Sequence, residues 1–411
     1  MSRALKIYSF PKSADAASRQ AAEWKTAKRW NPFNSNKLLA HVERWKRIRR
    51  GRPLPAPALV TVDPTNVCNF DCVWCNAAHI REHRNRRLSA TALTRFADFL
   101  PRWGRRNVDG FGVDAVCIAG GGEPLLNPAT AEFIDRLAAN GIETGVVTNG
   151  SLIYDHMDAL AQCTWIGVSL DAGTAETFNA LKGIADGKHT FESIVNNMAL
   201  LTEYARSRHM RLGSPHPAYG VSYKFLLHPG NIGEILDATR LAKEAGCKNI
   251  HFRPAGTPWN NLDTPDEIRF SVDDIALFNE QIAEAQELDD ETFSVYGVTH
   301  KFSDQFEREN CFDRCHSLFM TAVFAPPSGN IAHEDAFVMG LCCDRRGDAK
   351  LELLRDETDV ERIATAWGGK AHWKLHDSID IASECPRCTY QPHNQIYEQV
   401  ILNDSMTYKF I

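Results

Sequence analysis

Short apolar runs alternate with amphipathic stretches through the middle of the chain. Six of the runs have strand length and are rich in β-branched residues, which predicts strands at 59–62, 115–119, 144–148, 165–170, 221–227 and 249–252. Helical spacing of apolar residues predicts helices at 129–140, 174–181, 191–207 and 232–245. Strands and helices that alternate in this order predict a parallel α/β sheet, in which chemistry gathers at the carboxyl ends of the strands.

The flanking segments have different patterns. Residues 1–56 predict two short helices, and prolines at 53, 55 and 57 separate them from the first strand. A loop rich in Pro, Asn and Asp follows residue 256, with a helical pattern at 273–290. From residue 311 onward cysteines return beside a β-like run at 318–324, which predicts a second, smaller domain.

Length and composition describe an ordinary globular chain. It has 411 residues, and no apolar run approaches the roughly 18–20 residues that cross a bilayer. The first residues are polar and lack the apolar core of a signal peptide. We therefore expect a cytoplasmic protein without a membrane partner. In that compartment its 12 cysteines are more typical of metal ligands and buried thiols than of disulfides.

Charge is distributed unevenly. Residues 1–110 hold 22 Lys and Arg against 8 Asp and Glu, although the whole chain has a net charge of −6. The densest basic runs, 44–52 and 81–87, are compatible with solvated surfaces or with an anionic substrate. We do not expect a nucleic-acid partner, because no nucleic-acid-binding signature accompanies the charge.

Three cysteines follow the first predicted strand with the spacing C-x3-C-x2-C. Cys68, Cys72 and Cys75 can ligate three irons of a [4Fe–4S] cube, whose irons prefer thiolates. The fourth iron would then be open, as is usual at a catalytic metal site. Alternatives are a zinc site or unligated core cysteines, but no second C-x2-C or H-x3-H pair lies nearby.

This spacing, with the aromatic Trp74 before the last cysteine, resembles the radical S-adenosylmethionine (radical SAM) superfamily. In that family the open iron chelates SAM, and an electron from the cluster releases a 5′-deoxyadenosyl radical. The resemblance implies a partial (βα)6 TIM-like barrel. We expect a helical N-terminal extension at 1–57, the barrel at 58–256, a linker with a helical segment at 257–310 and an auxiliary-cluster α+β domain at 311–411.

A glycine run after the second strand adds to the resemblance. Gly121, Gly122, Glu123 and Pro124 match the family's GGEP motif, in which this segment contacts the SAM amino group. Asn149 and Ser169, which follow the third and fourth strands, are expected SAM contacts, with turn and cap roles as the alternative. Arg253 ends the sixth strand and could pair with the SAM carboxylate or form a structural salt bridge.

The C-terminal cysteines form a second group. Cys315, Cys342, Cys385 and Cys388 supply four thiolates, enough for one complete cube. The arrangement resembles the twitch domain, a shortened relative of the SPASM domain, which holds one auxiliary [4Fe–4S] cluster. Cys343 could replace Cys342, Cys311 could replace Cys315, and a zinc ribbon is the other interpretation.

The resemblance implies a radical SAM oxidoreductase or lyase that takes a hydrogen atom from an unactivated C–H bond. We expect a small polar substrate, such as a sugar, aminocyclitol or nucleotide, and a net oxidation or dehydration. A reductant such as flavodoxin or ferredoxin would be needed. The alternatives are a peptide maturase that cross-links or epimerises a ribosomal peptide, and a non-catalytic iron–sulfur carrier.

Overall fold

One open sheet organises the part of the chain that the structure describes. The computed structural model describes residues 35–51, 53–81, 86–104, 110–184, 188–214, 219–256, 259–261, 268–297, 312–327, 333–385 and 388–402. Within them, the strand order is β10-β9-β8-β1-β2-β3-β4-β5-β6-β7. The strands are β1 (Leu59–Val62), β2 (Ala115–Ile118), β3 (Glu143–Thr148), β4 (Trp165–Ser169), β5 (Gly220–Leu227), β6 (Asn249–Pro254), β7 (Ser294–Gly297), β8 (Thr321–Ala325), β9 (Phe337–Gly340) and β10 (Glu352–Glu357).

The six predicted strands are present as β1 to β6, each paired in parallel with the next. This confirms the open, mostly parallel α/β sheet expected of a partial barrel. Two further strands join the six in the sheet, and both come from segments outside the predicted barrel. β7 extends the sheet beyond β6, and β8 pairs in parallel with β1 on the other side. Antiparallel β9 and β10 complete that edge, so the C-terminal segment continues the barrel's own sheet.

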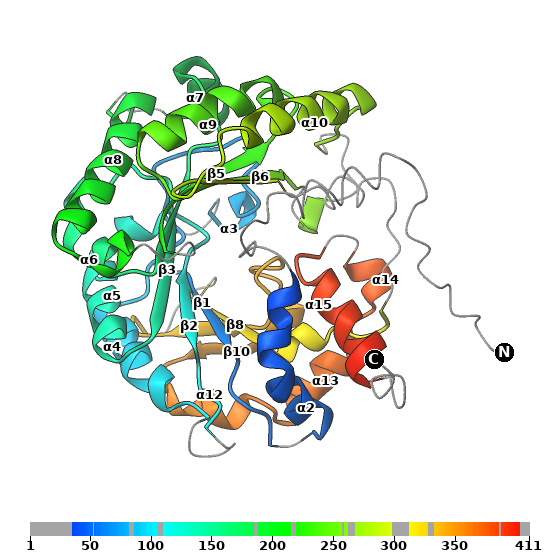
Figure 1. The fold of residues 1–411 in the computed structure, drawn as a ribbon. Helices are drawn as coiled ribbons and strands as arrows, with labels where there is room; N and C mark the ends of the chain where they lie inside the picture. Colours follow the sequence, from blue (N-terminus) through cyan, green and yellow to red (C-terminus); the bar gives the residue numbers. More distant parts are fainter. Residues whose placement is uncertain are drawn as a thin grey trace.

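Helices between the strands line one face of the sheet (Figure 1). They are α4 (Ala90–Phe99), α5 (Thr130–Ala139), α6 (Met157–Ala161), α7 (Ala175–Lys182), α8 (Phe191–Ser207), α9 (Ile235–Glu244) and α10 (Val272–Gln286). Side-chain caps set several of their starts: the hydroxyl oxygens of Ser89, Thr174 and Thr190 accept backbone N–H groups at the beginnings of α4, α7 and α8.

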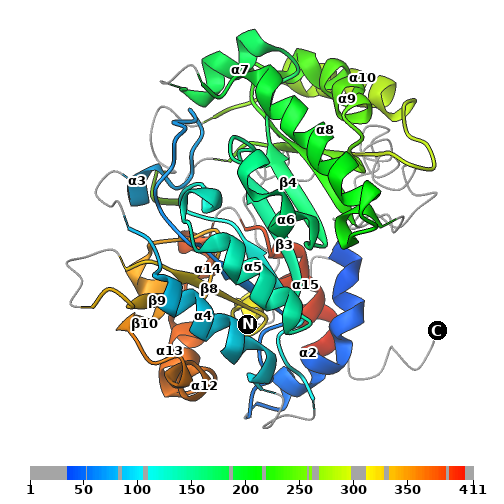
Figure 2. The same ribbon diagram turned by 90° about the vertical axis from the view of Figure 1, so that its left-hand side faces the viewer.

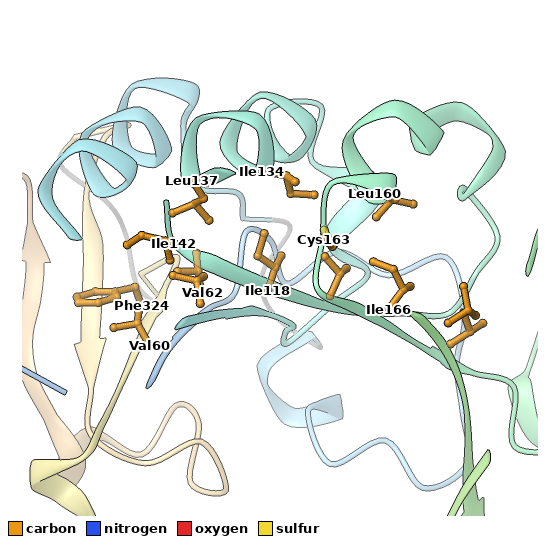
Figure 3. Packing of buried hydrophobic residues seen from close by; sticks show 14 of the residues in the cluster. Val60, Val62, Ile118, Ile134, Leu137, Ile142, Leu160, Cys163, Ile166 and Phe324 are labelled. Atoms are coloured by element: carbon orange, nitrogen blue, oxygen red, sulfur yellow. The ribbon is translucent and has the colours of Figure 1, made fainter. Parts of the chain in front are cut away.

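The core lies between these helices and the sheet (Figure 3). Val60, Val62, Ile118 and Ile166 alternate along their strands toward the helices, where they meet buried residues such as Leu137. The alternate side chains of the same strands point to the opposite face of the sheet, which is the interior of the barrel. The core thus occupies the layer between the sheet and these helices.

The chain's basic N-terminal segment packs against the C-terminal one, as Figure 1 and Figure 2 both show. The rings of Trp45 in α2 (Val42–Arg49) and Tyr397 in η10 (Tyr397–Leu402) have centroids 4.2 Å apart. The remaining helices near this end are α12 (Glu361–Ala366), α13 (Lys370–Ser378), α14 (Ile381–Glu384) and α15 (Gln391–Ile396). In the described residues, no helix is both long and apolar enough to cross a membrane.

Candidate active site

The first cysteine group lies in the loop that leaves β1. Cys68, Cys72 and Cys75 are partly exposed free thiols. Burial raises the pKa of Cys68, and it raises the pKa of Cys72 to about 11. The charge of Cys75 contributes to the rise in pKa of both thiols, and that of Cys68 contributes to the rise at Cys72. A bound metal overcomes such shifts, because a coordinating thiol is deprotonated outright.

The cysteine loop is held on the end of α7 by two backbone hydrogen bonds. Asp71 N donates to the carbonyl of Lys182 at 3.0 Å, and Val73 N donates to that of Leu181 at 3.1 Å. Gly183 ends the helix with a left-handed φ of +57°, and a Cβ there would lie 2.4 Å from the carbonyl oxygen of Asp71. Only glycine therefore allows this close approach between the helix end and the loop.

A buried ion pair lies beneath the same loop. Lys182 and Asp171 have side chains that are 2% and 1% exposed and are paired with each other. Lys182 Nζ also donates to the carbonyl oxygen of Ser169 at 2.8 Å and lies 5.5 Å from the ring centroid of Trp74. Burial lowers the pKa of Lys182, but the charges of Asp171 and Cys72 outweigh it and raise the pKa. The buried ammonium group of Lys182 thus lies close enough to Cys72 to lower the pKa of that thiol, and only a lysine in the last turn of a predicted helix pointed to it in the sequence.

The glycine run packs directly on the cysteine loop. Glu123 N donates to the carbonyl oxygen of Val67 at 2.8 Å, and a Cβ on Gly122 would lie only 2.1 Å from the same oxygen. Gly121 lies against Asn66. The two motifs, which are separate in the sequence, therefore form one surface at the carboxyl ends of β1 and β2.

The Glu123 carboxylate is buried and fully engaged within the protein. It accepts hydrogen bonds from Thr148 Oγ1 at 2.7 Å, from Asn149 N at 2.7 Å and from Leu125 N at 3.1 Å. Burial raises its pKa, and these three donors oppose the shift. The side chain joins the end of β2 to the end of β3, which leaves the backbone of the motif to meet a ligand.

The other residues expected to contact SAM lie at the same edge. Asn149 Nδ2 donates to Asn69 Oδ1 at 2.8 Å, and its Oδ1 accepts from Ser151, so this amide ties the cysteine loop to β3. Ser169 ends β4, and its carbonyl binds Lys182. Arg253 is half-buried near the end of β6, and in the described part of the chain no ion pair is found for it.

Four of the C-terminal cysteines surround one cavity, here called the cysteine cavity. It is lined by Cys315, Cys342, Cys385 and Cys388, together with apolar residues and the polar side chains of Ser317, Asp344, Arg345 and Tyr390. Burial raises the pKa of Cys315 to about 12 and that of Cys388 well above its usual range, and the other cysteines of the cavity raise both further. Four desolvated thiols around one space fit a thiolate-ligated cube.

The neighbouring cysteines are arranged differently. Cys343 Sγ lies 3.3 Å from Tyr390 Oη and does not line the cysteine cavity. Cys311 lies outside the described residues. Cys163 and Cys247 are buried in the core as expected, whereas the charges of Arg346 and Asp63 act on Cys117 from the barrel interior. Among the described residues, no group of three or more His, Cys, Asp or Glu side chains is arranged to hold a metal ion.

A second cavity, here called the central cavity, lies between the two cysteine groups. One wall carries Asn66 and Gly121 from the first site, and another carries Cys342 and Arg345 from the cysteine cavity. Val323 and Val338 from β8 and β9 form an apolar floor. The cavity therefore touches the glycine run beside the first cysteine group and one cysteine, Cys342, of the second.

The basic N-terminal helix lies at the other end of the sheet. Arg44 is 2% exposed, and its guanidinium donates to the carbonyl oxygens of Ala56 and Gly112 and to Asp114, just before β1 and β2 begin. Arg49 donates to the carbonyl oxygen of Ile401 at 3.0 Å, and Arg52 lies outside the described residues. The charge of α2 thus orders the amino ends of the strands and lends no support to an anionic substrate at their carboxyl ends.

Comparison with known proteins supports the resemblance to the radical SAM superfamily that the cysteine and glycine motifs indicate. The model of the radical SAM superfamily matches residues 62–216. The chain is 26% identical over 207 residues to a probable GTP 3′,8-cyclase of Saccharolobus islandicus (strain M.14.25 / Kamchatka #1), which covers 50% of this chain and 58% of that protein. It is 24% identical over 239 residues to the mycofactocin maturase MftC of Mycobacterium ulcerans (strain Agy99), which covers 57% of each. The chain therefore spans less than two thirds of the length of these relatives.

Two solved structures share the fold. Streptococcus suis SuiB bound to S-adenosylmethionine has a TM-score of 0.58 at 13% identity, over 90% of this chain and 81% of that one. Native anSMEcpe with bound AdoMet has a TM-score of 0.53 at 14% identity, over 82% and 91%. SAM and [4Fe–4S] clusters, the cofactors expected from the sequence, are those of this family. Residues 62–216 of this chain are therefore a domain of the radical SAM superfamily.

Proposed function

We propose that this chain is a radical SAM oxidoreductase or lyase in which a substrate is held between a SAM-binding cluster and one auxiliary cluster. The observation that carries the proposal is the central cavity, because its walls include both the glycine run of the first site and a cysteine of the second. When bound, the SAM-binding cluster supplies the electron that cleaves SAM. The protein's residues orient the two partners and exclude water around them.

The three ligands of the SAM-binding cluster are proposed to be Cys68, Cys72 and Cys75. Trp74, which is 6% exposed and packs against Leu181 and Ala255, fixes the loop rather than touching solvent. The backbone of the GGEP segment is proposed to meet the SAM amino group, while Glu123 holds that backbone in place. Ser169 and Arg253 are proposed to contact the rest of SAM, and Asn149 to act mainly through the cysteine loop.

The auxiliary cluster is assigned to Cys315, Cys342, Cys385 and Cys388. Their shared cavity supports Cys342 over Cys343, whose sulfur lies beside Tyr390 instead. An auxiliary cluster next to the central cavity could accept an electron from a substrate radical, which suits a net two-electron oxidation.

Replacing Cys385 or Cys388 by Ala should remove the auxiliary cluster. The variant should still cleave SAM when no substrate is added. The reason is that the first site has its own ligand set on a separate loop. Iron content should fall by about four atoms per chain, the content of one cube, while 5′-deoxyadenosine still forms under strong reductant. Cys343→Ala is the matched control and should keep all its iron. Loss of the first cluster's signal with retention of the second would show that the ligands are wrongly divided.

The central cavity favours an uncharged substrate. Its two arginines are already paired: Arg346 Nε lies 2.7 Å from an oxygen of Asp63, and Arg345 pairs with Asp348 and Glu384. Asn66 Nδ2 and Arg345 Nε are buried and have no hydrogen-bond partner among the described residues. Two such donors suit neutral oxygen acceptors such as hydroxyl groups, and we therefore favour a sugar over a phosphorylated nucleotide.

A ribosomal peptide is the second candidate substrate. Its carbonyl oxygens would satisfy the same donors, and the apolar floor formed by Val323 and Val338 would accommodate an aliphatic side chain. The class of compound that raises 5′-deoxyadenosine formation above the substrate-free rate distinguishes the two candidates.

A further inference from the structure

Arg345 stands in the wall between the central cavity and the cysteine cavity, and it lines both. Its side chain is 7% exposed. One terminal nitrogen, Nη1, lies 3.8 Å from Cys385 Sγ and donates a hydrogen bond to it. The other, Nη2, donates to Glu384 Oε2 at 3.1 Å and pairs with Asp348.

The contacts of Arg345 with the proposed ligands are not limited to Cys385. Its backbone N–H donates to the sulfur of Cys342, which lowers the pKa of that thiol against the larger effect of burial. The guanidinium lies 5.4 Å from the ring centroid of Trp259, which covers it. The residue thus touches two of the four cysteines and is held by carboxylates on one side and an indole on the other.

Hydrogen bonds to cluster sulfurs and nearby positive charge favour the reduced state, which carries one more negative charge. Asn394 also donates to a ligand sulfur, with Nδ2 3.8 Å from Cys315 Sγ, but its amide is neutral. Arg345 brings a guanidinium, which stays protonated in proteins and directs a charged donor at the sulfur, although Asp348 and Glu384 offset its net charge. Its two carboxylate partners fix the orientation of the fork toward the sulfur.

We propose that Arg345 is a positioning residue that sets the reduction potential of the auxiliary cluster on the side that faces the substrate. This inference rests on the proposed function, since it needs the auxiliary cluster to be present. It adds a residue that the cysteine pattern does not reveal. Arg345 would keep the cluster's potential high enough to accept an electron from the central cavity.

The test is an EPR-monitored redox titration of the auxiliary cluster in the full chain. A background with Cys68, Cys72 and Cys75 replaced by Ala isolates the auxiliary signal. In that background Arg345→Gln should keep about four irons and lower the reduced-to-oxidised ratio at a fixed potential at least tenfold, which is about 59 mV for a one-electron couple. Arg345→Lys keeps the charge but loses the fork, and should give a smaller shift in the same direction.

Lys350→Gln is the matched control. Lys350 binds the same carboxylate, Glu384, at 3.3 Å, but its side chain is 72% exposed and makes no contact with a cysteine. Its removal should change the ratio less than about twofold, because exposed charges are screened by solvent. An unchanged potential in Arg345→Gln, or an equal shift in Lys350→Gln, would overturn the proposal. Should Arg345→Gln fail to hold iron, Arg345→Lys decides: a fall in the ratio larger than that of Lys350→Gln supports the proposal, and a fall no larger than that overturns it. A background chain without iron would instead contradict the cluster assignment itself.

Discussion

Replacing Cys68, Cys72 and Cys75 together by Ala should halve the iron content of the reconstituted chain, from about eight atoms to about four, the content of one cube. The expectation follows from two thiol groups that are separate in the fold, one on the loop after β1 and one around the cysteine cavity. Iron and sulfide analysis after anaerobic reconstitution, together with EPR of the reduced chain, measures the result.

Cys163→Ala provides the control for this experiment. Cys163 is a fully buried thiol in the core, where it packs with Ile166 and Leu160 (Figure 3). Its removal should leave the iron content unchanged, whatever it costs in stability. A triple variant that kept all of its iron would show that the first loop holds no cluster.

The second large effect is expected from Lys182. In Lys182→Met the carboxylate of Asp171 stays buried without its counter-ion, and breaking a buried pair in this way costs about 3–5 kcal/mol of unfolding free energy. Among the described residues, the Asp171 carboxylate would keep only the hydrogen bond that Leu226 N donates to it at 2.7 Å. Urea unfolding of the metal-free chain, followed by circular dichroism, measures the loss.

Two further variants make this result specific. Lys46→Met removes an exposed lysine that pairs with Glu43, and it should change the unfolding midpoint little. The double variant Asp171→Asn with Lys182→Met removes both charges and should recover part of the loss. A single Lys182→Met variant as stable as Lys46→Met would show that the buried pair does not hold the site together.

Local patterns predicted the central strands well. The β-branched run at 59–62 and the helical spacing at 191–207 coincide with β1 and α8 in the structure. Both elements follow from side-chain periodicity within a short window. The sequence also predicted that the motifs would meet at one edge of the sheet, because the carboxyl ends of parallel strands lie on the same side. The cysteine loop, the glycine run and Asn149 do meet there.

The sequence pattern did not predict the contacts between segments that lie far apart in the chain. Nothing in the run at 321–325 shows that β8 pairs with β1, since pairing across so long a separation leaves no local periodicity. The adjacent thiols Cys342 and Cys343 differ only in the direction in which the backbone presents them. Arg44 was predicted as part of a basic surface, but its guanidinium binds backbone carbonyls at the amino ends of the strands.

The distribution of charge along the chain does not show where an anionic substrate would bind. A basic N-terminal third favoured an anionic partner, yet α2 lies away from the carboxyl edge and the arginines of the central cavity are neutralised by carboxylates. Where a charge acts depends on the fold as much as on its position in the chain. The paired arginines were visible only once Asp63 and Glu384 were brought beside them.

The most direct test of the central claim is SAM cleavage by the wild-type chain. The anaerobically reconstituted protein, given SAM and dithionite, should form 5′-deoxyadenosine and methionine in equal amounts, measured by liquid chromatography with mass detection. Recovery of intact SAM from a reduced chain that holds about eight irons would contradict the account.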